Sequence, residues 1–202
     1  MTDIKMFVDN VMRERDLPQV ESPPLAPLPY VDMSDWDRIQ VPEQEWTVLH
    51  RIPKRQCALF TGQGAAGKST IALHLCAAHA LSRDWLGATV EPGPAIFIDA
   101  EDDPNVMHRR LAAIGNHYEA TFAQMTNGGL HLLSFAGKDA VMATTTRGGK
   151  IEPTAIYKQV LEACGDIKPK MIGIASSANV FAGNEPRTKE KQKICSWRLF
   201  RN

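Results

Sequence analysis

Residues 62–69 read Gly62-Gln63-Gly64-Ala65-Ala66-Gly67-Lys68-Ser69 and match the phosphate-loop pattern G-x-x-x-x-G-K-[ST] at every fixed position. Glycines at this spacing let backbone N–H groups turn inward around an anion, where a Cβ atom would obstruct the turn. Lys68 can bring its charge to the β- and γ-phosphates, and the Ser69 hydroxyl can bind Mg²⁺. A helix that begins near Lys68 adds the positive end of its dipole. The stretch therefore predicts a phosphate-binding loop between a strand and a helix.

The sequence on both sides of this loop alternates short apolar runs with longer helical patterns. Strands are predicted over residues 56–60, 94–99, 130–134 and 171–174, and helices over residues 68–83, 104–114 and 154–165. Pro104 suits the first turn of its helix, with Asp102 or Asp103 as the N-cap. Residues 135–150, rich in Gly and Thr, are predicted to form a mobile loop. This alternation indicates an α/β domain with a mainly parallel sheet flanked by helices.

Composition excludes several classes of protein. The formal net charge is +0, which excludes a protein that coats DNA through a global positive charge, although a local basic patch remains compatible. No run approaches the roughly 18 apolar residues of a membrane-spanning helix, and no secretory signal is seen at the N-terminus. The four cysteines are widely spaced and predict neither a zinc site nor a disulfide scaffold. We therefore expect a cytoplasmic protein that does not enter the membrane.

Proline and charge patterns divide the chain into three parts. Residues 1–44 form a proline-rich arm or linker, in which Trp36 is expected to dock on the following domain. Residues 45–185 carry the alternating strands and helices of the core. Residues 186–202 lack apolar periodicity and form a basic, solvated tail.

A second motif lies downstream of the phosphate loop, where Ala95-Ile96-Phe97-Ile98-Asp99-Ala100-Glu101-Asp102-Asp103 is an apolar strand that ends in acids. With Trp46 upstream and Arg109-Arg110-Leu111 downstream, residues 46–185 resemble RecA-like P-loop ATPases of the AAA group. The acidic motif and the residues around it are most similar to those of RepA-type hexameric helicases and their relatives in phages and mobile elements.

The resemblance implies a RecA-like P-loop NTPase that hydrolyses ATP, with Mg²⁺, to drive DNA-associated work of the helicase or replication kind. It implies DNA and further copies of the chain, in a hexameric ring, as partners. Glu101 would be the catalytic base, acting with Lys68, and Ser69 would bind the metal. The nucleotide-binding residues are Gly62, Gln63, Gly64, Ala65, Ala66, Gly67, Lys68, Ser69 and Thr70. The alternative for Glu101 is that it caps the next helix together with Asp102 and Asp103.

The chain departs from this family pattern in two places. The strand over residues 171–174 is followed by Ala175-Ser176-Ser177-Ala178-Asn179, where the family has an aspartate that holds Mg²⁺ through water. Ser176 or Ser177 could substitute weakly, Asp99 could face the metal, or the serines could simply begin a loop. After Glu185 the resemblance ends, which predicts a core that is incomplete at its C-terminus.

These departures leave two alternatives to an ATP-hydrolysing domain. One is a nucleotide-binding fragment that is deficient in hydrolysis, and the other is a small-molecule kinase, because the phosphate loop alone fits both.

Several other residues that could be functional have simpler structural interpretations. Packing is expected for Trp46, His74, His79 and Cys57, with a nucleotide base as the alternative contact of Trp46. An ordinary loop is expected over residues 147–150, with nucleic acid or a neighbouring subunit as its alternative contact.

Overall fold

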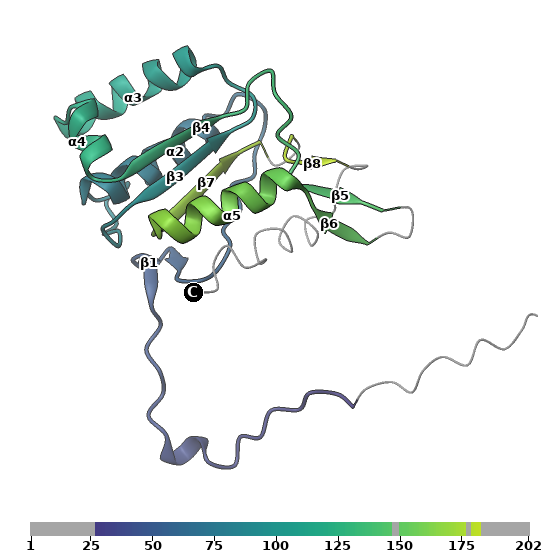
Figure 1. The fold of residues 1–202 in the computed structure, drawn as a ribbon. Helices are drawn as coiled ribbons and strands as arrows, with labels where there is room; N and C mark the ends of the chain where they lie inside the picture. The colour runs from purple at the N-terminus through teal and green to yellow at the C-terminus, as the bar shows by residue number, and fades with distance from the viewer. Residues whose placement is uncertain (1–26, 147–149, 177–178, 183–202) are drawn as a thin grey trace, which may run out of the picture. The chain divides into compact units, whose positions relative to one another are not determined.

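The computed structural model describes residues 27–146, 150–176 and 179–182. Contacts divide the chain into two units, Met1–Pro42 and Glu43–Asn202. In the first unit, residues 27–42 contain one 3-10 turn, η1 (Trp36–Arg38), in which Arg38 lies 3.4 Å from the carboxylate of Asp35. The candidate site lies entirely in the second unit, whose elements are shown in Figure 1.

The second unit alternates strands and helices in the order expected of an α/β domain. The elements are β1 (Trp46–Val48), β2 (Ile52–Pro53), α2 (Lys68–Leu81), β3 (Ala95–Asp99), α3 (Pro104–Tyr118), α4 (Phe122–Asn127), β4 (Leu130–Ser134), β5 (Ala143–Thr145), β6 (Ile151–Pro153), α5 (Ala155–Ile167), β7 (Met171–Ala175) and β8 (Phe181–Ala182). None of the helices in the described ranges is long and apolar enough to cross a membrane.

The central sheet has three parallel strands in the order β4-β3-β7. Helices α2 and α3 cover one face of this sheet and α5 covers the other (Figure 1). The predicted α/β class, with a parallel sheet flanked by helices, is confirmed. In this register Asp99 lies between Ser134 of β4 and Ala175 of β7, so the three strands end side by side at one edge.

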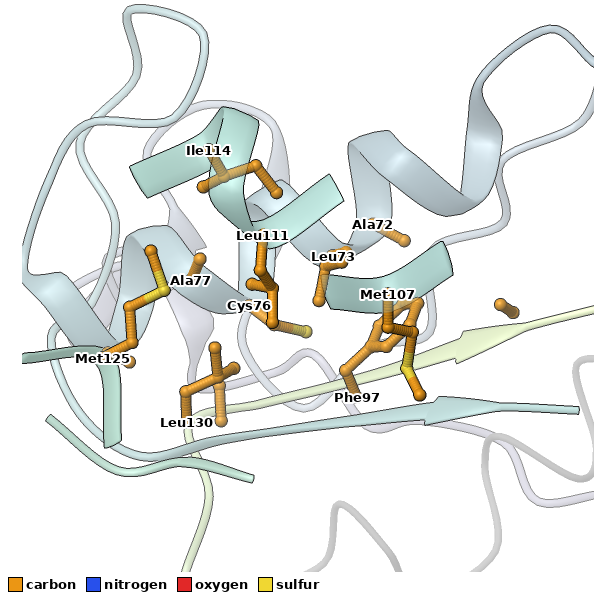
Figure 2. Packing of buried hydrophobic residues seen from close by; sticks show 13 residues of the cluster. Ala72, Leu73, Cys76, Ala77, Phe97, Met107, Leu111, Ile114, Met125 and Leu130 are labelled. Atoms are coloured by element: carbon orange, nitrogen blue, oxygen red, sulfur yellow. The ribbon is translucent and has the colours of Figure 1, made fainter. Parts of the chain in front are cut away.

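Strand β3 is the centre of the core, and all five of its residues are buried. Ala95 and Phe97 point to the cluster formed with α2, α3 and α4 (Figure 2), whereas Ile96 and Ile98 point to the cluster under α5. A strand that is buried on both faces needs apolar side chains at nearly every position, since successive side chains point to opposite faces. This need explains why residues 94–98 form a continuous apolar run.

The beginning of α3 follows the predicted capping chemistry. Asp103 is the N-cap of α3, and its carboxylate accepts hydrogen bonds from the backbone N–H groups of Asn105 (2.7 Å) and Val106 (3.2 Å). Two helices extend further than predicted, α3 to Tyr118 and α5 to Ile167, whereas α2 ends at Leu81, two residues before its predicted end. Each ends at a residue in the left-handed conformation, which closes the helix.

The strand predicted over residues 56–60 is wrong. This segment is neither helix nor strand, and Leu59 and Phe60 are each 40% exposed. A strand requires a partner to satisfy its backbone N–H and C=O groups. The edge of β7 that faces away from β3 lies across a cavity from this segment, so the apolar run has no ladder to join within the described ranges.

The mobile loop predicted over residues 135–150 is also wrong in part, because it contains β5. That strand pairs antiparallel with β6 and parallel with β8, which forms a second, three-stranded sheet. Threonines at 144 and 145 favour a strand, and the pairing with β6 satisfies their backbone groups. Residues 147–149 of the predicted loop and the predicted basic tail, residues 186–202, lie outside the described residues.

Candidate functional site

The phosphate loop leads directly into α2, which begins at Lys68 as the motif predicts. Residues 61–67 are exposed, and Ala65 (φ +60°) and Gly67 (φ +79°) adopt the left-handed conformation. Successive left- and right-handed residues point neighbouring backbone N–H groups into one concavity, which is the geometry of an anion-binding nest. A Cβ atom placed on Gly64 or Gly67 would meet no protein atom within 4 Å, so the space above the loop is open.

The N-terminus of α2 differs from those of the other helices described. Side chains of Asp103, Thr121 and Thr154 cap α3, α4 and α5, but no side-chain hydrogen bond caps α2. The first N–H groups of a helix have no intrahelical acceptor and need one from elsewhere. An anion such as a phosphate can supply it and gains from the helix dipole. The loop geometry and the absent cap therefore both fit a phosphate group.

Lys68 lies over this loop. Its Nζ donates hydrogen bonds to the backbone carbonyls of Gly62 (3.1 Å) and Gln63 (2.8 Å). The side chain therefore sits where its charge can reach an anion bound by the loop. Ser69 and Thr70 follow in the first turn of α2 and are half-buried.

A cavity of about 780 Å³ joins this loop to the acidic end of β3. Glu101 and Asp102 line the cavity together with Arg110 of α3 and Ser176 after β7. The loop residues that also line it are Gly64, Ala65, Ala66, Gly67, Lys68, Ser69 and Thr70, whereas Gly62 and Gln63 do not. The structure thus brings most of the predicted binding residues and Glu101 to one hollow.

The turn after β3 is held by a buried carboxylate. Asp99 is completely buried, and its Oδ1 accepts hydrogen bonds from the backbone N–H groups of Glu101 (2.9 Å) and Asp102 (3.0 Å). Its Oδ2 is buried and has no hydrogen-bond partner, and Arg110 Nη1 lies 3.9 Å from it. Glu101 itself is exposed and lines the cavity.

Two residues of this arrangement carried no functional prediction from the sequence. Arg110 pairs with the Oδ2 of Asp102 at 2.5 Å. Asn179, which follows β7, donates from Nδ2 to Glu101 Oε1 (3.4 Å) and to the carbonyl of Ala100 (3.5 Å). The contacts of Asn179 join segments 78 and 79 positions apart in the sequence, so no local spacing could have identified this residue. Arg110 lies only eight positions after Asp102, and this short separation was the available signal for that pair.

The end of β7 carries no carboxylate among its described residues. Ala175 is buried beside Asp99, Ser176 lines the cavity, and Ser177 lies outside the described residues. No group of three or more His, Cys, Asp or Glu side chains within the described ranges could hold a metal ion. Mg²⁺ is commonly held by one or two protein oxygens together with substrate phosphates. The Ser69 hydroxyl at a phosphate loop fits that kind of site.

Of the remaining candidates in the described ranges, only Cys57 lines the cavity. Trp46 packs near His50, with ring centroids 5.5 Å apart, and does not line the cavity, whereas Cys57 is half-buried and does. His74 packs against His117 and Tyr118, and burial lowers its pKa, as does the charge of His117. His79 is completely buried, and burial lowers its pKa as well.

A comparison with known protein families gives a match over most of the chain. Residues 21–199 match the family model described as an AAA domain. The chain belongs to the AAA domain family. An AAA domain is a nucleotide-binding module of the ATPase class, and the phosphate loop, the uncapped helix and the cavity lie inside the matched region. The expectation of an ATPase of the P-loop type is therefore confirmed at the level of the family.

Proposed function

We propose that this AAA domain binds ATP with Mg²⁺ at the phosphate loop and hydrolyses it, with Glu101 acting on the attacking water. The observation that carries the proposal is the single cavity shared by Lys68, Ser69 and Glu101. Phosphoryl transfer to water needs positioning and charge neutralisation more than covalent help from the protein. These three side chains supply a cation, a hydroxyl and a carboxylate for those tasks.

Each residue has a separate part in this mechanism. The loop N–H groups and Lys68 bind the β- and γ-phosphates and stabilise the charge of the transition state. Mg²⁺, when bound, neutralises phosphate charge, and the Ser69 hydroxyl would hold it. Glu101 orients a water molecule and accepts its proton as the water oxygen forms a bond to the γ-phosphorus and the bond to the ADP oxygen breaks. The products are ADP and inorganic phosphate.

The proposal extends to work on DNA by a ring of identical subunits. Its support is the similarity of residues 95–103 and 109–111 to RepA-type helicases, together with the AAA family match. Fold and family alone do not fix a partner, so this part is tested separately. Stimulation of turnover by single-stranded DNA and a hexamer in native mass spectrometry are expected.

One observation favours a second function, the binding of ATP without turnover. Ala175 stands where the resemblance implies a metal-orienting aspartate, so the negative charge near Mg²⁺ is reduced. Under this alternative the domain would act as a nucleotide-dependent binding module. Turnover and binding must therefore be measured on the same preparation.

The first experiment is a calorimetric titration of MgATP into the full chain beside the Lys68→Ala variant. We expect micromolar binding that falls at least about 100-fold in the variant, because the charge on the phosphates is lost. No heat from the intact chain would reject the binding site.

Phosphate release then separates the two functions. Glu101→Gln should lower kcat about 100-fold while MgATP affinity stays within about twofold, since a carboxamide cannot accept the proton. Glu162→Gln, an exposed position on α5, is the matched control and should change neither quantity. Binding without phosphate release in the intact chain would favour the second function.

A further inference from the structure

The backbone turn that carries Glu101 is held by hydrogen bonds to one buried side chain. Asp99 accepts the N–H groups of both Glu101 and Asp102 through a single oxygen. Hydrogen bonds to a charged acceptor are stronger than neutral ones. The direction in which Glu101 leaves the sheet is therefore set by the carboxylate of Asp99.

This buried carboxylate is balanced by a cation from another element. Arg110 of α3 lies 3.9 Å from Asp99 Oδ2 and 2.5 Å from Asp102 Oδ2, so one guanidinium faces two carboxylates. A buried charge without such compensation is costly. Because α3 begins at Pro104, directly after the turn, Arg110 ties the helix back to the turn that precedes it.

The same contacts argue against Asp99 as a metal ligand. Asp99 is completely buried and is not among the residues that line the cavity with Lys68 and Ser69. One of its oxygens is occupied by two N–H groups, and the other faces Arg110. A cation beside this carboxylate competes with Mg²⁺ on electrostatic grounds.

We propose that Asp99, balanced by Arg110, is a positioning residue that aims Glu101 at the water beside the phosphate loop. This inference rests on the proposed function, in which Glu101 acts on that water. A displacement of about 1 Å at a reacting group can cost on the order of 100-fold in rate. Asp99, which is buried and does not line the cavity, therefore acts on the rate through Glu101 and not through contact with ATP or Mg²⁺.

Steady-state kinetics of Asp99→Asn provide the main test, with Arg109→Gln as the matched control. Arg109 is exposed, adjoins Arg110 and does not line the cavity. We expect Asp99→Asn to lower kcat about 10- to 100-fold while KM for MgATP and the Mg²⁺ concentration for half-maximal rate stay unchanged. A raised Mg²⁺ requirement, with kcat restored at saturating Mg²⁺, would overturn the proposal and make Asp99 a metal ligand.

Arg110→Lys and Arg110→Gln test the balancing charge and remain informative if Asp99 variants fold poorly. The lysine keeps the charge but not the planar geometry, so kcat should recover in part relative to the glutamine variant. Equal kcat values for Arg110→Gln and the unaltered chain, with both folded, would contradict the proposed role of Arg110.

Amide hydrogen exchange tests the positioning without relying on turnover. Asp99→Ala removes the acceptor, so exchange at the Glu101 and Asp102 amides should accelerate about tenfold or more, while exchange across α5 stays unchanged. Unaltered exchange at the two amides would overturn the inference. An unaltered chain that binds MgATP but releases no phosphate would instead reject the proposed hydrolysis, and the exchange result would still decide whether Asp99 holds the turn.

Discussion

Strands β3 and β7 lie side by side in the same sheet and end at the same edge, yet they differ in burial and in chemistry. All five residues of β3 are buried, whereas residues 171–174 of β7 are half-buried. The reason is pairing: β3 has a neighbour on both edges, and β7 pairs only with β3 in the part of the sheet that the structure describes. The free edge of β7 faces the cavity.

The strand ends differ in charge as well. Strand β3 ends in Asp99 and is followed by Glu101 and Asp102, while β7 ends in Ala175 and continues to Ser176. The proposed chemistry therefore depends on one strand for its carboxylates, and the segment after β7 contributes a neutral amide, that of Asn179. At this edge of the sheet, the end of β3 therefore supplies the charged groups, and the segment after β7 supplies a neutral amide that contacts Glu101.

Ala175→Asp removes the difference in charge between the ends of β3 and β7, and it should have the largest effect on the free energy of unfolding. Ala175 is 3% exposed and lies in register with the buried Asp99, so the new carboxylate would be buried beside a like charge. We expect the free energy of unfolding to fall by about 3–5 kcal/mol, which is typical of an uncompensated buried charge. Urea denaturation with and without MgATP measures this change.

Ala175→Asn is the control for size, because it adds nearly the same volume without the charge. It should cost clearly less than the aspartate at neutral pH. Recovery of the aspartate variant by MgATP beyond that of the unaltered chain would show that the position faces the metal. Equal stability of the two variants would show that a carboxylate at position 175 is not repelled by the carboxylate of Asp99.

Gly173→Ala tests the other special feature of β7, its close approach to α2. A Cβ at this position would lie 2.8 Å from the Sγ of Cys76 and 3.1 Å from the ring of Phe97. Cys76 is completely buried, and burial raises the pKa of its thiol to about 12, so it packs as a small apolar side chain. Overpacking of this kind should cost about 1–3 kcal/mol in thermal or urea unfolding.

Two variants make this measurement specific. Gly165→Ala in α5 adds a Cβ with no atom within 4 Å and should stabilise the chain by about 0.5–1 kcal/mol. Cys76→Ala should relieve Gly173→Ala, so that the double variant is less destabilised than the two single changes added together. Simple additivity would mean that the backbone of β7 moves away from α2 instead.

The sequence predicted the elements whose local signals agree with their packing. Residues 94–99 are apolar at nearly every position, and Asp103-Pro104 carries both a cap and a first-turn proline, so β3 and the start of α3 were found. The strand expected at residues 56–60 failed because an apolar run does not encode its partner. The contact of Asn179 with Glu101 was missed for the same reason, since it joins residues 78 positions apart.

The smallest effect is expected at His79, the buried histidine of α2. The carboxylate of Asp99 faces two N–H groups and a guanidinium, but His79 has only its Nδ1 paired, with the Glu91 carbonyl at 2.5 Å, and its Nε2 is buried without a partner. Burial lowers the pKa of His79 below 6.5, although the carbonyl and carboxylate of Glu91 act in the opposite direction.

A histidine with a lowered folded pKa takes up its proton first in the unfolded chain. The free energy of unfolding should therefore fall as the pH drops below about 6.5 and stop falling at the folded pKa, and it should not change with this group above about pH 7.5. His79→Gln should flatten the slope between pH 6.5 and 5 in urea denaturation, whereas the exposed His131→Gln should leave it unchanged. His74 contributes in the same direction, so part of the slope remains. An unchanged slope in His79→Gln would show that the Glu91 carboxylate already compensates the charge, as Arg110 does for Asp99.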